Sequence, residues 1–335
     1  MSVAHIGDHM KKIMLICQIL LLTFTFASAE EPVVLRVAYL PLLSQLPIIV
    51  SYENDHLNYS HIEVELIQFK SFTSIEAAIR VGAIHAASIP VPMILSIASN
   101  MYDCNLCQIK IVGATHIGGS SMVSSVEGDI NALRGKMIGI PGMDSVESFS
   151  LMKIMDNKGM IFGLDYKGIG ITFDTAISDL KNEKLDALYL PEPWGSIAEK
   201  EVGAHIIESQ LFNIDHPTTM LVLSKKMITE NQMAINEWIK SLISACDFIE
   251  NDIAKTNAMQ IAIIQKKYFQ LNQDIVIQSL TQRKGNLKFI PSIPEISYIK
   301  SNMEQAAKIK WIMKSVACDQ LVDTKLFENK IQANQ

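Results

Sequence analysis

Short apolar runs that end at proline, glycine or serine recur along the first half of the chain, and helical spacing follows each run. Residues 33–40 are β-branched and apolar with one charge, the pattern of a buried parallel strand, and this run stops at Pro41. Residues 62–69 alternate as a second strand, and residues 86–89 form a third that stops at Pro90. Repeated strand, loop and helix predict a parallel sheet covered by helices, which is the α/β class.

The same alternation returns in the middle of the chain before helices take over. Residues 108–114 predict a strand that runs into a segment with two adjacent glycines, Gly118 and Gly119, where the chain can bend or approach a ligand closely. A second α/β unit is then predicted from four further short strands, at residues 137–140, 169–173, 187–190 and 204–208. Residues 220–223 predict a strand that returns to the first sheet, and the pattern beyond Lys225 is helical.

Two helix starts are predicted from capping boxes, in which a polar side chain and a Glu three residues later bond to backbone N–H groups. Thr73 and Glu76 form one such pair, and Asp144 and Glu147 form the other. Because the first N–H groups of a helix attract negative charge, these two starts are predicted to hold a small anion without any lysine.

A strand that runs into a Pro-Glu-Pro-Trp turn is the most distinctive local motif. Pro191 and Pro193 stiffen the backbone, so Glu192 and Trp194 are held rigidly side by side. This pairing predicts one wall of a binding pocket, in which Glu192 faces a cationic or amide group of the ligand. The alternative is a strand end whose Trp packs in the core and whose Glu is solvated.

The first 29 residues predict a secretory signal peptide. Lys11 and Lys12 precede an apolar run over residues 13–26, and a small-residue site ends at Ala29, where cleavage is expected. The apolar run is too short for a confident membrane span. Met1 and Met10 both remain possible starts.

Charge and cysteine content exclude some classes of function. The chain has 29 Lys and Arg against 35 Asp and Glu, which argues against a nucleic-acid partner. Cys104 and Cys107 form a close pair that an exported protein can hold as a disulfide, or simply tolerate, and we favour both readings over a metal site.

Four short motifs together resemble a known family. In order, the chain contains Leu35–Pro41, Glu76–Ile79 followed by Gly82–Ala87, Leu133–Gly139, and Glu192–Trp194. This series resembles periplasmic solute-binding proteins of nitrate, sulfonate and taurine uptake, which are similar to the thiamine-pyrimidine-precursor group. The resemblance covers residues 33–250, and His85 departs from it where the family usually carries Asp.

The resemblance implies a two-lobe periplasmic binding protein fold of type II, with the second lobe inserted in the first and helices at the C-terminus. Lobe 1 is expected to hold residues 30–116 and 217–335, and lobe 2 residues 117–216. Ligands of such sheets bind outside the carboxyl ends of the strands. The predicted ligand-binding residues are Ser44, Gln45, Ser71, Phe72, Thr73, Pro90, His116, Gly119, Ser120, Gly142, Asp144, Ser145, Glu192, Trp194 and Thr218.

The implied function is capture of a small solute and its delivery to an ABC permease in the inner membrane, by a monomer without cofactor, metal or catalytic residues. Aliphatic sulfonates, taurine, nitrate or a related anion are the expected solutes. An amine-bearing sulfonate or an aminopyrimidine suits Glu192 better than nitrate does, so a binding protein for a thiamine pyrimidine precursor is an alternative. An enzyme on the same fold and a periplasmic sensor are alternatives of other classes, although the cysteine-rich run of the related pyrimidine synthase is absent.

Overall fold

The computed structural model describes residues 31–99, 108–207 and 215–334. The predicted signal peptide and the Cys104–Cys107 pair lie outside these residues. From Val33 onward the chain forms one compact unit. Within the described residues, no helix has both the length and the apolar character that crossing a membrane requires.

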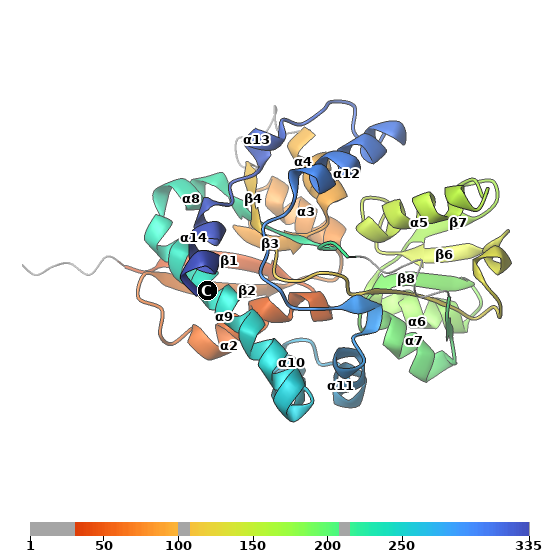
Figure 1. The fold of residues 1–335 in the computed structure, drawn as a ribbon, viewed down its shortest axis with the longest axis horizontal. Helices are drawn as coiled ribbons and strands as arrows, with labels where there is room; N and C mark the ends of the chain where they lie inside the picture. Colours follow the sequence, from red (N-terminus) through yellow and green to blue (C-terminus); the bar gives the residue numbers. More distant parts are fainter. Residues whose placement is uncertain (1–30, 100–107, 208–214, 335) are drawn as a thin grey trace, which may run out of the picture. The chain divides into compact units, whose positions relative to one another are not determined.

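The fold contains two five-stranded sheets, each at the centre of one lobe (Figure 1). In lobe 1, β1 pairs in parallel with β2 and β3, whereas β10 runs antiparallel to β3 and β4. The strand order of this sheet is β2 (Ile62–Gln68), β1 (Val33–Tyr39), β3 (Ala86–Ile89), β10 (Met220–Ser224) and β4 (Ile109–Gly113). The strand predicted at residues 220–223 therefore does return to the first sheet.

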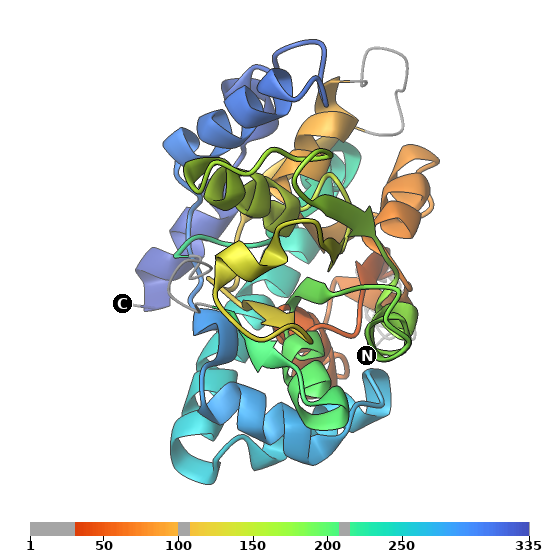
Figure 2. The ribbon, with the colours of Figure 1, turned by 90° about the vertical axis from the view of Figure 1, so that its right-hand side faces the viewer.

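Lobe 2 repeats this arrangement with a separate stretch of chain (Figure 2). Its β6 pairs in parallel with β7 and β8, and β5 runs antiparallel to β8 and β9. The strand order is β7 (Lys167–Gly170), β6 (Met137–Ile140), β8 (Ala187–Pro191), β5 (Ser120–Ser124) and β9 (His205–Ile206). The strands β5 to β9 of the second sheet lie between β4 and β10 of the first sheet in the sequence. This confirms the expected two-lobe α/β fold, in which the second lobe is an insertion in the first.

Helices cover both sheets. Those between the strands of lobe 1 are η1 (Leu43–Gln45), α2 (Leu46–Asp55), α3 (Phe72–Arg80) and α4 (Val91–Ser99). Those of lobe 2 are η3 (Ile130–Leu133), α5 (Val146–Asn157), α6 (Phe173–Lys181) and α7 (Trp194–Val202). The C-terminal part adds α8 (Lys225–Glu230), α9 (Gln232–Thr256), α10 (Met259–Tyr268), α11 (Gln273–Thr281), η4 (Lys284–Asn286), α12 (Ile296–Lys308), α13 (Cys318–Leu321) and α14 (Lys325–Asn334).

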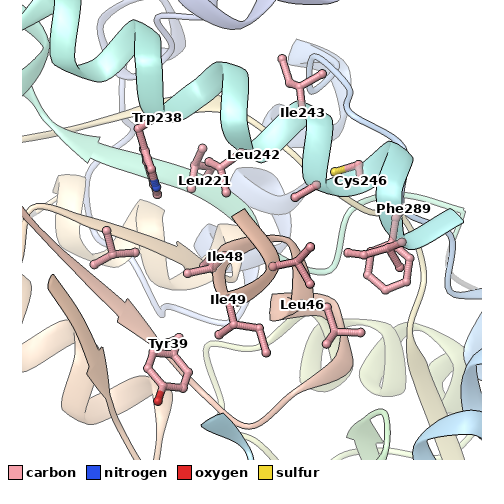
Figure 3. Packing of buried hydrophobic residues seen from close by; sticks show 14 of the residues in the cluster. Tyr39, Leu46, Ile48, Ile49, Leu221, Trp238, Leu242, Ile243, Cys246 and Phe289 are labelled. Atoms are coloured by element: carbon pink, nitrogen blue, oxygen red, sulfur yellow. The ribbon is translucent and has the colours of Figure 1, made fainter. Parts of the chain in front are cut away.

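The long helix α9 shows how the sequence pattern determines packing. Its apolar residues recur at helical spacing, so one face meets α2 and the first sheet. Trp238 has no exposed surface and points into this core beside Leu221, with α2 opposite (Figure 3). Trp238 is therefore a core residue, as its helical spacing predicts.

Three backbone segments cross between the lobes side by side. The middle segment, residues 114–119, forms isolated β-bridges with Pro217 on one side and with Lys288 and Ser292 on the other. The lobe boundaries predicted from the sequence, near residues 116 and 216, imply two crossings, and the segment at residues 285–292 is a third. We call residues 114–119, 215–219 and 285–292 the hinge ribbon.

A glycine allows the third segment to approach so closely. Gly285 has φ +61°, and a Cβ there would lie 2.6 Å from the backbone nitrogen of Ser120. Only a residue without a side chain fits this contact.

Replacing Gly285 with Ala is expected to destabilise the fold more than the same change at Gly203. Gly203 has φ +69°, but a Cβ added there would have nothing within 4 Å, so Gly203→Ala costs only about 1 kcal/mol of backbone strain. Gly285→Ala adds a clash with backbone atoms and should lower the free energy of unfolding by about 2 kcal/mol more. Urea unfolding measures the free energy of unfolding of both variants. Equal decreases would show that the backbone around Gly285 shifts to accept a Cβ at little cost.

Candidate functional site

Buried polar side chains collect where the strand ends of the two lobes meet. All are at most 8% exposed. They come from both lobes, from the hinge ribbon and from α11. We call this set the interlobe polar layer: Ser44, Gln45, Ser88, His116, Ser120, Ser121, Asp144, Ser145, Glu147, Glu192, Ser196, Thr218, Thr219 and Ser279. Because buried polar groups normally have hydrogen-bond partners, the exceptions within the layer are informative.

Glu192 is the most extensively bonded member of the layer. It is 1% exposed, and its Oε1 accepts from the hydroxyl of Ser121 in β5. Its Oε2 accepts from the hydroxyl of Ser196 at 2.7 Å, from the Ser196 N–H at 3.3 Å and from the hydroxyl of Ser279 at 3.1 Å. Burial raises the pKa of Glu192, and these donors oppose that rise. Both oxygens thus face protein donors from β5, α7 and α11.

The amino end of α5 carries a second bonded carboxylate. Glu147 is 2% exposed and accepts from the hydroxyl of Ser120 at 2.6 Å. Ser145 caps the helix by accepting from the Ser148 N–H at 3.0 Å. The protein therefore places its own carboxyl group where an anionic ligand was predicted, and burial raises the pKa of that group.

Both predicted capping boxes are wrong by one or two residues. The cap of α3 is Ser71, which accepts from the Ser74 N–H at 3.2 Å, and Thr73 is exposed within the first turn. The cap of α5 is Ser145 instead of Asp144. In each case a serine lies three residues before a suitable N–H, which is the spacing that capping requires.

This shift leaves Asp144 without a capping role. Asp144 is 7% exposed, and no side-chain donor of the described residues bonds to its carboxylate. Burial raises its pKa to about 6; its own backbone N–H opposes the rise, and Glu76 of α3 adds to it. Glu76 belongs to lobe 1, so this part of the rise in the pKa of Asp144 comes from the opposite lobe.

Three aromatic rings also join the lobes. Phe72 of lobe 1 meets Phe173 edge-on, with ring centroids 6.2 Å apart. Phe173 stacks on Trp194 at 5.8 Å. The indole nitrogen of Trp194 is buried without a hydrogen-bond partner. Trp194 therefore presents an unsatisfied donor next to the interface.

The hinge ribbon contributes a neutral histidine. His116 is completely buried, and its Nε2 lies 2.9 Å from the hydroxyl of Thr218, which also donates to the Gly118 carbonyl at 3.2 Å. Its Nδ1 has no partner, and burial lowers its pKa to about 3, so the ring is uncharged at neutral pH. His216 does not join it; that ring stacks on Tyr298 at 4.5 Å.

The remaining predicted residues divide into structural contacts and open groups. Gln45 donates to the Ser88 carbonyl at 2.9 Å, and Gly119 accepts from the Glu192 N–H at 2.7 Å, so both have structural contacts. Ser44 is 2% exposed and its hydroxyl has no partner. Pro90 is buried directly after β3, and Gly142 lies half-buried in the loop after β6.

Several interface residues were missed from the sequence: Glu76, Ser121, Phe173, Ser196 and Ser279. Glu76 is the one that a sequence signal identifies, because it lies four residues after Phe72 and therefore on the same face of α3. Ser121, Phe173 and Ser279 meet partners that are distant in the chain. Ser196 bonds to Glu192 only four residues before it, a helical spacing that the sequence contains.

A groove of about 890 Å³ opens between α5, β8 and α12 next to the hinge ribbon. Phe149 and Tyr189 line it from lobe 2, and His216 and Tyr298 from the opposite side. In the part of the chain that the structure covers, no three His, Cys, Asp or Glu side chains gather as a metal site would require.

Together, the inserted lobe, the hinge ribbon and the polar layer define a two-lobe solute-binding protein fold. The sequence match agrees: residues 28–264 match the model of the NMT1-like family, and the chain belongs to that family. No curated protein sequence matches the chain significantly.

Solved structures share the fold at low sequence identity. The periplasmic nitrate-binding protein NrtA of Synechocystis PCC 6803 has a TM-score of 0.80 and 15% identity, covering 90% of this chain and 89% of NrtA. The ligand-binding component of an ABC-type import system from Staphylococcus aureus has a TM-score of 0.75 and 16% identity, covering 89% of this chain and 99% of that protein. The aliphatic sulphonate binding protein SsuA of Escherichia coli has a TM-score of 0.68 and 15% identity, covering 88% of this chain and 92% of SsuA.

An enzyme shares the fold as well. The desulfurization enzyme DSZB has a TM-score of 0.59 and 11% identity, over 90% of this chain and 100% of that chain. The fold is thus common to transport proteins and to an enzyme.

Glu192→Ala is expected to destabilise the fold strongly, whereas Glu192→Gln should be tolerated. Alanine leaves a cavity and three buried serine hydroxyls without their acceptor, a loss of about 3–5 kcal/mol in the free energy of unfolding. Glutamine can accept at the Oε2 position and donate to Ser121, so its cost should stay near 1 kcal/mol. Urea unfolding tests the stabilities. A changed ligand preference in Glu192→Gln at unchanged stability would instead support the predicted ligand contact.

Asp144→Asn should remove a pH-dependent loss of stability. Because the folded pKa of about 6 exceeds the ordinary value of 3.8, the folded state holds this proton longer, and stability falls as pH rises from about 4 to 6. The asparagine variant should therefore gain about 2–3 kcal/mol over the native chain between pH 4 and pH 7. Glu127→Gln, at an exposed carboxylate, is the control and should track the native chain. If the stability of Asp144→Asn changed with pH in the same way as that of the native chain, the raised pKa of Asp144 would be contradicted.

Proposed function

We propose that this chain is the solute-binding component of an ABC import system, which traps a small solute between its lobes and delivers it to a permease in the inner membrane. The observation that carries the proposal is the set of unpartnered polar atoms in and beside the interlobe polar layer: the Ser44 hydroxyl from lobe 1, the Trp194 indole nitrogen from lobe 2 and His116 Nδ1 from the hinge ribbon. A bound solute would supply the missing partners.

The family and the fold support this proposal. Structural relatives named as import or periplasmic binding proteins share both lobes with this chain. The predicted signal peptide fits the same role, because such a protein must be exported to the periplasm. Lobes joined by a hinge can close on a solute and open again to release it.

Charge narrows the solutes that the interface suits. The buried charged side chains of the described residues are Asp144, Glu147, Glu192 and Asp252, all carboxylates. Nitrate would meet no buried cation here, whereas taurine and aminopyrimidines carry nitrogen groups that a carboxylate can accept from. Solutes with an amine therefore fit better than simple anions do.

Trp194→Phe is expected to weaken solute binding at least tenfold while the fold is kept. Phenylalanine preserves the ring that stacks on Phe173 but removes the indole N–H. Trp311→Phe is the matched control, since Trp311 is 39% exposed and lies after α12. Isothermal titration with the solute retained on purification measures both affinities.

The proposal itself is tested by native mass spectrometry of protein purified from its own cells, together with a thermal-shift panel of sulfonates, taurine, nitrate and aminopyrimidines. A retained mass or a raised Tm is expected, because ligand at 100 times Kd adds about 2.7 kcal/mol of stability. A protein that carries no small molecule and responds to no solute in the panel would overturn it.

A further inference from the structure

We propose that Ser279 and Lys284, which belong to lobe 1, are positioning residues of the solute site. They hold Glu192 and Glu199 of lobe 2 and thereby fix the start of α7, where the unpartnered indole nitrogen of Trp194 lies. This inference rests on the proposed function and adds to it the contacts that hold the lobes closed. We call these two contacts, Ser279 with Glu192 and Lys284 with Glu199, the interlobe clamp.

The packing of α11 assigns this helix to lobe 1. Val276 and Leu280 lie one helical turn apart, are at most 1% exposed and belong to the hydrophobic core that β1, α2 and α9 build. Ser279, next to Leu280, is fully buried and donates to Oε2 of Glu192 at 3.1 Å. In addition, α11 packs against both α10 and α7 (Figure 1). The bond from Ser279 therefore joins the two lobes.

Two neighbouring cations after α11 bind acids in opposite lobes. Arg283 donates to Glu250 of α9, in lobe 1, at 2.9 and 2.5 Å. Lys284, the next residue, lies 3.0 Å from Glu199 of α7, in lobe 2. Glu250 also accepts from the Phe289 N–H at 2.7 Å, so lobe 1 holds the chain on both sides of Lys284. Lys284 therefore reaches lobe 2 from a segment that lobe 1 keeps in place.

Burial distinguishes the ion pair of the clamp from a second pair that joins the lobes. The side chains of Lys284 and Glu199 are 16% and 28% exposed. Lys308 of α12 lies 3.8 Å from Asp156 of α5, and these side chains are 70% and 71% exposed. Water and salt screen an exposed pair, so it contributes little, whereas a partly buried pair is screened less. The Lys284 pair is therefore expected to affect the position of the lobes more than the Lys308 pair does.

Glu192 connects the clamp to the atoms that a solute would meet. Its carbonyl oxygen accepts from the Leu43 N–H at 2.9 Å, and the next residue, Ser44, has a buried hydroxyl without a partner. Trp194 follows Glu192 by two residues and begins α7. The clamp therefore fixes how far Trp194 of lobe 2 lies from Ser44 of lobe 1. Its members act on the solute only through these groups.

Opening of the lobes must break the clamp. Glu192 would keep its bonds to Ser121 and Ser196, which both belong to lobe 2, and lose the bond to Ser279. Because the clamp consists of protein groups alone, it favours the closed arrangement before a solute is present. Apparent affinity rises in proportion to the population of the binding-competent form. Loss of the clamp should thus lower affinity without removing any contact to the solute.

Charge reversal tests the ion pair in the ligand-free chain, from which retained solute is removed by unfolding in urea, dialysis and refolding. Lys284→Glu and Glu199→Lys should each shift the ratio of closed to open molecules about tenfold toward open, as the loss of a bond to a charged group does. The double variant restores the attraction and should close the lobes again. Lys308→Glu, at the exposed pair, is the matched control and should behave like the native chain.

Two measurements report the opening of the lobes. Small-angle X-ray scattering gives the radius of gyration, which rises as the lobes separate. Acrylamide quenching of fluorescence in a Trp311→Phe background reports the exposure of Trp194, because Trp238 has no exposed surface. Urea unfolding of the same samples shows that each variant is folded.

Ser279→Ala tests the hydrogen bond of the clamp, with Ser241→Ala as its control. Ser241 is also buried and donates to a carboxylate, that of Asp55 at 2.6 Å, but both of these residues belong to lobe 1. Both variants should lose stability in urea, whereas only Ser279→Ala should raise the radius of gyration and the quenching of Trp194. A merely structural role of Ser279 predicts no such difference.

Binding connects the clamp to the solute site. The panel compound with the largest thermal shift should bind Lys284→Glu about tenfold more weakly than the native chain, and the double variant with native affinity. Unchanged scattering and quenching in Lys284→Glu, or a double variant as open as the single ones, overturns the inference while the proposed function stands. Unchanged affinity in a variant that opens overturns it as well. If no panel compound binds, the proposed function fails, and the ligand-free measurements still decide whether the clamp exists.

Discussion

A buried carboxylate with four hydrogen-bond donors determines how one side of the interface is assembled. Glu192 can remain buried only if β5, α7 and α11 all bring their serines to it. Its backbone carbonyl also accepts from the Leu43 N–H at 2.9 Å, which adds lobe 1 to the same point. The ion pair between Lys284 and Glu199, 3.0 Å apart, attaches the segment after α11 to α7 in addition. The C-terminal helices are thus built into the contact between the lobes.

Glu192 already accepts four hydrogen bonds from the protein, whereas the acids at the amino end of α5 have fewer donors. There Glu147 accepts from the hydroxyl of Ser120, whereas Asp144 accepts from its own backbone N–H. The distinction depends on where serines lie, since Ser145 takes the cap of α5 and Ser120 bonds to Glu147.

The sequence predicts the strands well because each is a short β-branched run bounded by a breaker, as in the eight residues before Pro41. Helix starts are less certain, because several polar residues stand close together at each start. At both helix starts a serine close to the predicted capping box accepts the backbone N–H bond instead. Ser71 accepts from the Ser74 N–H, and Ser145 accepts from the Ser148 N–H. These differences of one or two residues change which side chain points to the interface.

Two of the three serine partners of Glu192 were beyond reach of the sequence, whereas Ser196 lies only four residues after it. Ser121 and Ser279 lie 71 and 87 positions away from it, and no local pattern links them. The Pro-Glu-Pro-Trp turn indicated a carboxylate held in one position, and Glu192 is indeed buried and hydrogen-bonded. Only the tertiary fold shows which groups surround it. The same holds for the third segment of the hinge ribbon, which follows a helix far along the chain.

That third segment has a mechanical consequence. Residues 114–119 are flanked on both sides by bridged backbone, so the connection between the lobes is a flat strip three chains wide. A strip of this kind bends more readily across its thin direction than within its own plane, because in-plane bending would stretch the bridges between its segments. Any hinge motion at this strip therefore disfavours sliding of one lobe sideways past the other.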